Sequence, residues 1–237
     1  LPVAIVEEPE AVRQADRILF PGVGAFGPAM QHLRDSGLLE VMEEKVQSGT
    51  PLLGICVGAQ LLMDLGQENG PHQGLGWIAG EVSRFEHQLK VPQIGWNEVE
   101  LRKPDPLFQG LRNGSYFYFV HSYHLRPNDL EVVLGETEYG YPFASAVRKD
   151  NVWGVQFHPE KSGKQGLALL RRFVSLARST QANLGAVVSG TTTLAPRIIA
   201  ALDVRTNDQG DLVVTKGDGY DVREKTEGER AVRNLGK

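Results

Sequence analysis

The sequence has 237 residues, of which 41% are hydrophobic and 23% charged, and its formal net charge is −4. This length suffices for one large domain or two small ones, and the small negative charge argues against nucleic acid as the main partner. The single cysteine excludes an internal disulfide and a Cys-rich zinc site, so we expect a reducing compartment, the cytoplasm. No apolar run reaches the roughly 18 residues of a membrane span, and no signal peptide is visible, so we expect no membrane association.

Residues 1–178 show the alternation of strands and helices that is typical of an α/β domain. Short apolar runs at residues 1–6, 17–20 and 50–55 predict buried strands. Helical periodicity at residues 38–46 and 59–65 predicts helices between and after them. This βαβα order favours an open, mostly parallel sheet that is covered by helices.

From residue 81 onward the sequence pattern changes. Strand-like runs between residues 81 and 146 are separated by Gly, Pro, Asn and Asp, which predicts antiparallel hairpins added to the sheet. A strand at 152–157 and a helix at 166–177 then complete the domain. Residues 179–196 have the Ser, Thr, Gly and Ala content of a linker. Residues 197–237 contain strand-like runs but too few apolar residues for a core, so we interpret them as the beginning of a second domain.

Cys56 lies between an apolar strand and a helical run, within Gly54-Ile-Cys-Val-Gly58. This is the strand–turn–helix setting of a nucleophile elbow, with Cys in place of Ser. The flanking glycines permit a sharp turn, and the start of a helix favours the thiolate. The alternative is a buried structural cysteine, because free cysteines are often buried.

A cysteine nucleophile needs a base, and His158 is the best candidate among the six histidines. It directly follows the strand at 152–157, where ligands of parallel sheets gather. Glu160, two residues further on, is suited to orient the imidazole as the third member of a triad. His32, His72 and His87 lie in polar surroundings, and we expect them on the solvated surface.

The glycine-rich residues 21–27 follow the strand at 17–20 and are suited to form an oxyanion hole with their peptide N–H groups. They also fit the GxGxxG spacing of a dinucleotide site. A dinucleotide fingerprint must also open a helix and be followed by an acidic residue about 20 positions on, so the spacing alone is a weak indication. The nucleophile predicted at Cys56 favours the oxyanion hole instead.

Residues 21–24 (Pro-Gly-Val-Gly), 54–60 (Gly-Ile-Cys-Val-Gly-Ala-Gln) and 156–160 (Gln-Phe-His-Pro-Glu) together resemble the class I, triad-type glutamine amidotransferases. Residues 92–98, 118–123 and 158–162 are similar to the glutaminase part of the imidazole glycerol phosphate synthase family, which acts in histidine biosynthesis. The tail at 197–237 resembles the first β/α segment of that family's cyclase, a (β/α)8 barrel, as in its fused form.

The resemblance implies a role for individual residues. Cys56 would attack glutamine, His158 would act as base and acid, and Glu160 would orient His158. The implied oxyanion hole consists of Gly22, Val23, Gly24 and Val57, and the implied glutamine-binding residues are Gln60, Glu68, His121, Ser122 and Tyr123. For Gln60 and Glu68 the alternatives are packing and capping. Pro92, Ile94 and Trp96 would lie where the glutaminase meets the cyclase, although Trp96 is also suited to the core. Asp203 would be a catalytic acid of the cyclase, and Lys216 would approach its phosphorylated substrate.

The implied reaction is glutamine hydrolysis that supplies ammonia to the cyclase in the same chain. The cyclase substrate would be phosphoribulosyl-formimino aminoimidazole carboxamide ribonucleotide, and no cofactor or metal is implied. The family's first strand and helix would precede residue 1, and most of the barrel would follow residue 237. Two alternatives remain: another triad amidotransferase, serving anthranilate, GMP or pyridoxal phosphate synthesis, and an inactive module that only docks on a partner.

Overall fold

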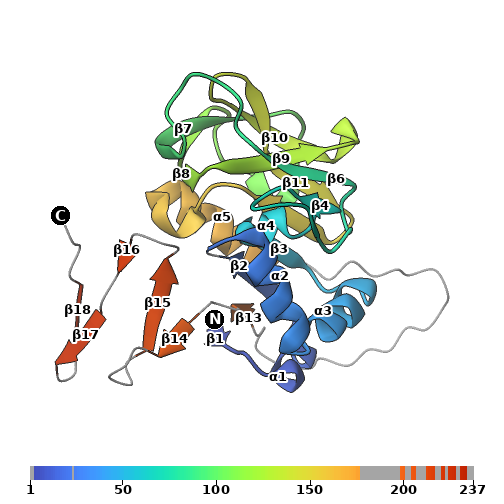
Figure 1. Ribbon diagram of the computed structural model, residues 1–237, viewed down its shortest axis with the longest axis vertical. Helices are drawn as coiled ribbons and strands as arrows, with labels where there is room; N and C mark the ends of the chain where they lie inside the picture. Colours follow the sequence, from blue (N-terminus) through green and yellow to red (C-terminus); the bar gives the residue numbers. More distant parts are fainter. Residues whose placement is uncertain are drawn as a thin grey trace.

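The computed structural model describes residues 3–22 and 24–176, and the backbone of six short strands between residues 198 and 233. Its main sheet has 13 strands in the order β1-β13-β2-β3-β12-β11-β9-β6-β4-β5, with β10, β7 and β8 branching from β11 (Figure 1). The helices are α1 (Pro9–Arg13), α2 (Phe26–Asp35), α3 (Leu38–Gln47), α4 (Val57–Gln60) and α5 (Gly163–Ser175), with 3₁₀ turns η1 (Pro106–Phe108), η2 (Leu130–Val132) and η3 (Pro159–Lys161).

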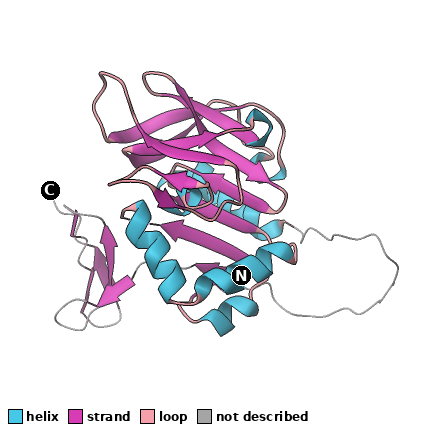
Figure 2. Ribbon diagram, turned by 45° about the vertical axis from the view of Figure 1, so that its right-hand side comes forward, coloured by secondary structure: helices cyan, strands magenta, loops and turns pink. Residues whose placement is uncertain are grey.

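The parallel part of the sheet consists of β1 (Val3–Ile5), β13 (Ile198–Ala200), β2 (Arg17–Gly22), β3 (Leu52–Cys56) and β12 (Val152–Val155). Every residue of β3 and β12 is buried, as expected for strands covered on both faces. Figure 2 shows that the helices gather around this half of the molecule. The predicted βαβα order is therefore confirmed here.

The other part of the sheet is mainly antiparallel. It contains the strands β4 (Leu65–Gly66), β5 (His72–Gln73), β6 (Gly80–Arg84), β7 (Gln93–Leu101), β8 (Ser115–His121), β9 (Tyr123–Pro127), β10 (Val133–Glu138) and β11 (Pro142–Lys149). Of their pairings only β4 with β6 is parallel. The expected hairpins are present, but they are numerous enough that the sheet is mixed and not mostly parallel.

The predicted helix at residues 59–65 is wrong in extent. α4 ends at Gln60. The Leu61 amide still bonds four residues back, to Val57, but the amides of Leu62 and Met63 bond three residues back, to Ala59 and Gln60. Asp64 then accepts a hydrogen bond from the Gly80 amide through its side chain, at 2.8 Å, which turns the chain into β4. Leu61, Leu62 and Met63 are buried in the turn that follows α4, so periodicity alone overestimated the helix.

The carboxyl-terminal strands are described by their backbone. β13 pairs in parallel with β1 on one side and β2 on the other, so these residues of the tail belong to the main sheet. β14 (Val204–Thr206), β15 (Leu212–Lys216) and β16 (Tyr220–Asp221) form an antiparallel sheet, and β17 (Glu224–Glu227) pairs with β18 (Arg230–Arg233). The predicted linker at 179–196 lies outside the described residues.

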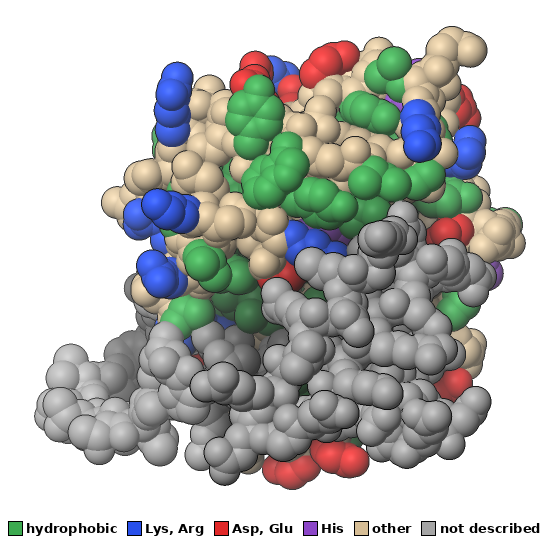
Figure 3. All heavy atoms as spheres, turned by 90° about the vertical axis from the view of Figure 1, so that its left-hand side faces the viewer, with side chains coloured by type: hydrophobic (Ala, Val, Ile, Leu, Met, Phe, Trp, Pro, Cys, Tyr) green, Lys and Arg blue, Asp and Glu red, His purple; other side chains and the backbone are tan. Residues whose placement is uncertain are grey.

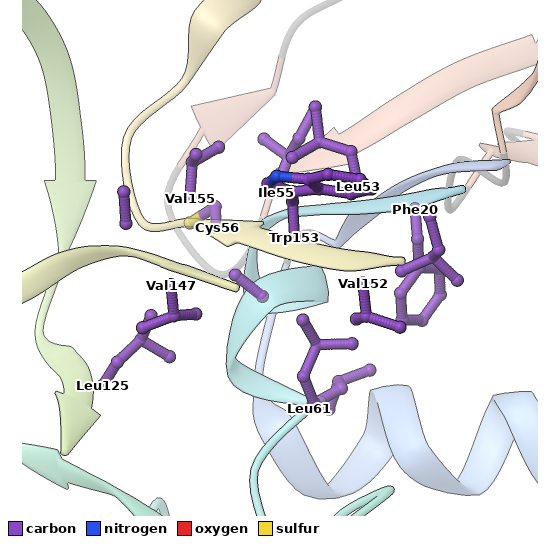
Figure 4. Close-up of a cluster of buried hydrophobic side chains, with 14 of the residues drawn as sticks. Phe20, Leu53, Ile55, Cys56, Leu61, Leu125, Val147, Val152, Trp153 and Val155 are labelled. Carbon is purple, nitrogen blue, oxygen red and sulfur yellow. The ribbon is translucent and has the colours of Figure 1, made fainter. Parts of the chain in front are cut away.

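One hydrophobic cluster joins both parts of the sheet, and Cys56 belongs to it. Figure 4 shows Cys56 beside Val155, at the end of strands β3 and β12, with Leu53, Trp153 and Val152 further along the same strands. The proposed nucleophile thus stands where the buried parallel strands end. Among the described residues, no helix is both long and apolar enough to span a membrane.

Candidate active site

Cys56 lies in a sharp turn between β3 and α4. Its φ of 54° and ψ of −112° are unusual for a non-glycine residue. The turn requires glycine at position 58, because a Cβ atom there would overlap the carbonyl oxygen of Phe20. A Cβ on Gly54 would lie 2.7 Å from the carbonyl oxygen of Gly58. The predicted elbow is present, and its glycines permit the close approach of β2 and β3 to α4.

The glycine-rich segment after β2 lies against this elbow. Gly22 is the register partner of Cys56, and a Cβ on Gly22 would lie 2.5 Å from the amide nitrogen of Gly58. Gly24 has a φ of 93°, which only glycine adopts readily. The structure therefore brings Gly22 beside Cys56 and Val57, and Gly24 follows two residues beyond the end of β2. Val23, the remaining residue of the expected oxyanion hole, lies outside the described residues.

His158 follows β12 and is held by its backbone. Its amide donates to the carbonyl of Tyr118 on β8, at 2.8 Å. The hydroxyl of Ser162 donates to the His158 carbonyl at 2.6 Å and accepts from the amide of Tyr118 at 3.0 Å. Ser162 was not singled out in the sequence, yet it fixes both the His158 backbone and strand β8.

The side chain of His158 is 7% exposed and points one ring nitrogen at Glu160. Nδ1 lies 2.7 Å from Oε1 of Glu160, and Nε2 has no hydrogen-bond partner among the described residues. Burial works to lower the pKa of His158, but the Cys56 thiolate and the Glu160 carboxylate together raise it to about 10. With Nδ1 held by Glu160, Nε2 is the ring nitrogen that can carry the proton of the Cys56 thiol.

The pKa of Glu160 is shifted in the direction opposite to that of His158. Its burial works to raise its pKa, but the hydrogen bond and charge of His158 hold that pKa below its usual value. Its side chain remains about half exposed, at 48%. A carboxylate that is ionised here stabilises the imidazolium and fixes the tautomer of His158.

The expected glutamine-binding residues make different kinds of contact in the structure. Gln60 is 3% exposed and donates to the Tyr123 carbonyl at 2.8 Å. Glu68 accepts from the Phe26 amide at the start of α2, at 2.8 Å, which is a capping contact. His121 is buried, and its Nδ1 lies 2.8 Å from the carbonyl oxygen of Tyr123. Their role in binding glutamine stays a prediction.

The side chain of His121 packs into an aromatic cluster around Phe85. His87 belongs to the same cluster, with both ring nitrogens buried, so its predicted place on the solvated surface is wrong. His72 lies under α2, where its ring would meet a Cβ on Gly27 at 2.7 Å, whereas His32 is exposed as predicted. These contacts come from strands distant in the sequence, which local polarity could not reveal.

Two of the expected interface residues, Ile94 and Trp96, lie on strand β7, and Pro92 directly precedes that strand. Ile94 is 48% exposed and Trp96 52%, so Trp96 is not a core residue. Tyr116 on the neighbouring strand β8 is 51% exposed, and the Lys161 ammonium lies 5.9 Å from the ring centre of Tyr118. Figure 3 shows a band of hydrophobic side chains with basic residues beside it on this side of the molecule. Asp203 and the side chain of Lys216 lie outside the described residues.

A buried carboxamide completes the site. Gln156 is fully buried, and its Nε2 lies 3.8 Å from Sγ of Cys56. It precedes His158 in the motif that pointed to the base, but the sequence did not identify it as part of the site. Among the described residues, no group of three or more His, Cys, Asp or Glu side chains is arranged to hold a metal ion.

Comparison with known proteins agrees with this arrangement. The family model for class-I glutamine amidotransferases matches residues 2–176. The chain is 48% identical over 236 residues to the chloroplastic imidazole glycerol phosphate synthase hisHF of Arabidopsis thaliana, covering 98% of this chain but 39% of that protein. It is 47% identical over 184 residues to the imidazole glycerol phosphate synthase subunit HisH of Herpetosiphon aurantiacus, covering 78% of this chain and 87% of that protein.

Solved structures agree on the fold. A crystal structure of a glutamine amidotransferase matches with a TM-score of 0.56 at 23% identity, covering 72% of this chain and 83% of that one. A putative GMP synthase protein from Thermoplasma acidophilum matches with a TM-score of 0.51 at 19% identity, covering 71% of this chain and 75% of that one. The chain belongs to the class-I glutamine amidotransferase family and, within it, to the imidazole glycerol phosphate synthase HisH proteins.

Proposed function

We propose that this chain hydrolyses glutamine to glutamate and ammonia as the glutaminase part of an imidazole glycerol phosphate synthase. The observation that carries the proposal is the placement of Cys56 and His158 at the ends of two adjacent parallel strands, β3 and β12, with His158 held by Glu160. Identity to HisH and hisHF proteins supports the synthase, and histidine biosynthesis as its pathway.

The residues support one order of steps. His158 takes the thiol proton of Cys56 through Nε2, and Sγ attacks the side-chain amide carbon of glutamine. In this proposal the peptide N–H groups of Gly22, Gly24 and Val57 stabilise the resulting oxyanion. The C–N bond then breaks as His158 gives its proton to the leaving amide nitrogen, which departs as ammonia, and water hydrolyses the thioester to glutamate and regenerates the Cys56 thiol.

We propose further that residues 197–237 begin the cyclase barrel, although β13 pairs here with β1 and β2 of the main sheet, and that residues 179–196 link the barrel to the glutaminase domain, residues 1–178. The identity to the fused Arabidopsis protein across 98% of this chain supports this division, although the chain spans only 39% of that relative. Asp203 and Lys216 would then serve the cyclase, whose substrate would be the phosphoribulosyl-formimino aminoimidazole carboxamide ribonucleotide.

Pro92, Ile94 and Trp96 are proposed to contact the cyclase. In support, Ile94 and Trp96 are exposed on one strand, and exposed apolar patches commonly mark interaction sites. A cytoplasmic location stays a prediction from the single cysteine, while the Arabidopsis relative is named as chloroplastic.

The proposal is tested by labelling with an electrophilic glutamine analogue, followed by a glutaminase assay with and without a complete cyclase. We expect label on Cys56, the only cysteine, and glutamate release that is lost in Cys56→Ala. Cys56→Ala that retains full glutaminase activity would refute the triad. Ammonia that enters anthranilate, GMP or pyridoxal phosphate, and not the cyclase product, would assign another branch of the family. A folded chain that neither labels nor hydrolyses glutamine would be a docking module.

A further inference from the structure

Two buried carboxamides, Gln60 and Gln156, connect the nucleophile to strand β9. Gln156 is 0% exposed and Gln60 is 3% exposed. Nε2 of Gln156 lies 3.8 Å from Sγ of Cys56, within reach of a hydrogen bond to sulfur. Nε2 of Gln60 lies 3.2 Å from Oε1 of Gln156 and 2.8 Å from the carbonyl oxygen of Tyr123. The four groups form one continuous chain.

The network determines which way each amide faces. A carboxamide carries two N–H donors, and those of Gln60 are used by the Tyr123 carbonyl and Oε1 of Gln156. Gln156 therefore presents its oxygen to Gln60 and its NH₂ group to Cys56. The reverse orientation would place the Gln156 NH₂ against the Gln60 donor and an oxygen lone pair against the sulfur, which a thiolate would repel.

The backbone holds Gln156 in this position. Its amide donates to the carbonyl of Ser145 on β11 at 2.9 Å, and two residues later the amide of His158 is bonded to β8. The donor next to the sulfur is thus fixed between two strands before any substrate arrives. A donor that is already oriented stabilises a developing charge without the cost of reorganisation.

We propose that Gln156 is a positioning residue that orients and stabilises the thiolate of Cys56, and that Gln60 acts by holding Gln156. This inference rests on the proposed glutaminase function. When His158 takes the thiol proton, the Gln156 N–H donates to the negative sulfur, and this bond weakens as the sulfur becomes a neutral thioester. Gln60 is then required for the orientation of Gln156, in contrast to the substrate contact that the family resemblance implies for it.

The test measures the alkylation rate of Cys56 by iodoacetamide as a function of pH, which requires neither glutamine nor a cyclase. Cys56 is the only cysteine, so the rate reports this thiol alone. We expect Gln156→Leu to move the midpoint of the profile upward by about one pH unit, the equivalent of a tenfold change. Gln156→Glu keeps the shape but adds a negative charge, and we expect a larger upward shift.

Gln60→Leu is expected to move the midpoint in the same direction by a smaller amount. The double variant is expected to shift no further than Gln156→Leu alone, because both changes break the same chain. Asn151→Leu is the matched control. It removes another buried carboxamide, bonded to the carbonyls of Val46 and Thr50 at the opposite end of β12, and we expect the profile to stay unchanged.

Glutaminase kinetics separate the two roles of Gln60. If it acts through Gln156, Gln60→Leu lowers kcat with little change in KM, whereas a substrate contact would raise KM. A folded Gln156→Leu with the wild-type alkylation profile overturns the inference, and Gln156→Glu or Gln60→Leu decides if the first variant does not fold. Failure of the proposed function appears instead as a wild-type protein that alkylates normally but does not hydrolyse glutamine.

Discussion

Nδ1 of His158 donates a hydrogen bond to Oε1 of Glu160 across 2.7 Å, with the imidazole buried and the carboxylate about half exposed. The two residues lie in one turn after β12, so the contact needs no other element to bring them together. It leaves Nε2 as the only ring nitrogen that is available to Cys56. This local contact thus orients the imidazole, whereas its charge depends on Cys56 as well as on Glu160.

Glu160→Gln is expected to lower kcat for glutamine hydrolysis about 10²-fold with little change in KM. The neutral amide no longer stabilises the imidazolium of His158, and an orienting carboxylate in a triad contributes up to about 10⁴. We expect the lower value because the side chain is 48% exposed. The exposed Glu131→Gln serves as control, and a Glu160→Gln kcat within twofold of wild type would contradict the assignment.

Gly58→Ala is expected to destabilise the protein by about 3 kcal/mol, because its Cβ would overlap the Phe20 carbonyl and backbone atoms cannot easily move away. Gly114→Ala provides the comparison, since nothing lies within 4 Å of its Cβ and only its φ of 74° is unfavourable. Its expected cost is about 1 kcal/mol. Urea unfolding measures both, and equal costs would show that the crowding at the elbow is unimportant.

Arg148→Met is expected to cost about 3 kcal/mol of stability. Asp105, with a side chain 2% exposed, lies 2.8 Å from Arg148, and loss of a partner leaves its charge buried. The Trp153 indole and the Leu107 amide still donate to that carboxylate, which limits the loss. Arg102→Met breaks the pair between the exposed Arg102 and the partly exposed Glu136, and we expect a cost of less than about 1 kcal/mol. Urea unfolding at pH 7 that gives similar values for both variants would contradict this ranking.

Acid is expected to destabilise the protein partly through His124. Burial lowers its pKa to about 4, so the folded protein keeps it neutral while the unfolded chain binds a proton below about pH 6.5. The stability from this group is therefore present above pH 6.5 and lost as pH falls towards 4, by about 2–3 kcal/mol at pH 4.5. His124→Gln should remove that part of the pH dependence in urea unfolding, and the exposed His32→Gln should not. Equal acid sensitivity of wild type and His124→Gln would contradict the prediction.

Local sequence was sufficient for the elements whose determinants lie close together in the chain. The run of apolar residues in β3, the glycines around Cys56 and the pair His158–Glu160 are each decided within a few residues. The catalytic residues could be predicted for the same reason, because the nucleophile, the base and the orienting carboxylate each lie in a short sequence motif. Of the tail strands, β13 and β15 were likewise visible as apolar runs, but not their partners in the sheet.

The sequence by itself determined the α/β class, the elbow at Cys56, the base and its carboxylate, because steric and charge requirements at these positions act over short stretches. Tertiary structure alone decided that the sheet is mixed, that His87 is packed among aromatic rings, that Trp96 is exposed, and that Gln156 meets the thiol. Each of these depends on which distant strands become neighbours. Strand pairing depends on the burial of the whole sheet. Every strand contributes to that burial, so no single segment of the sequence determines the pairing.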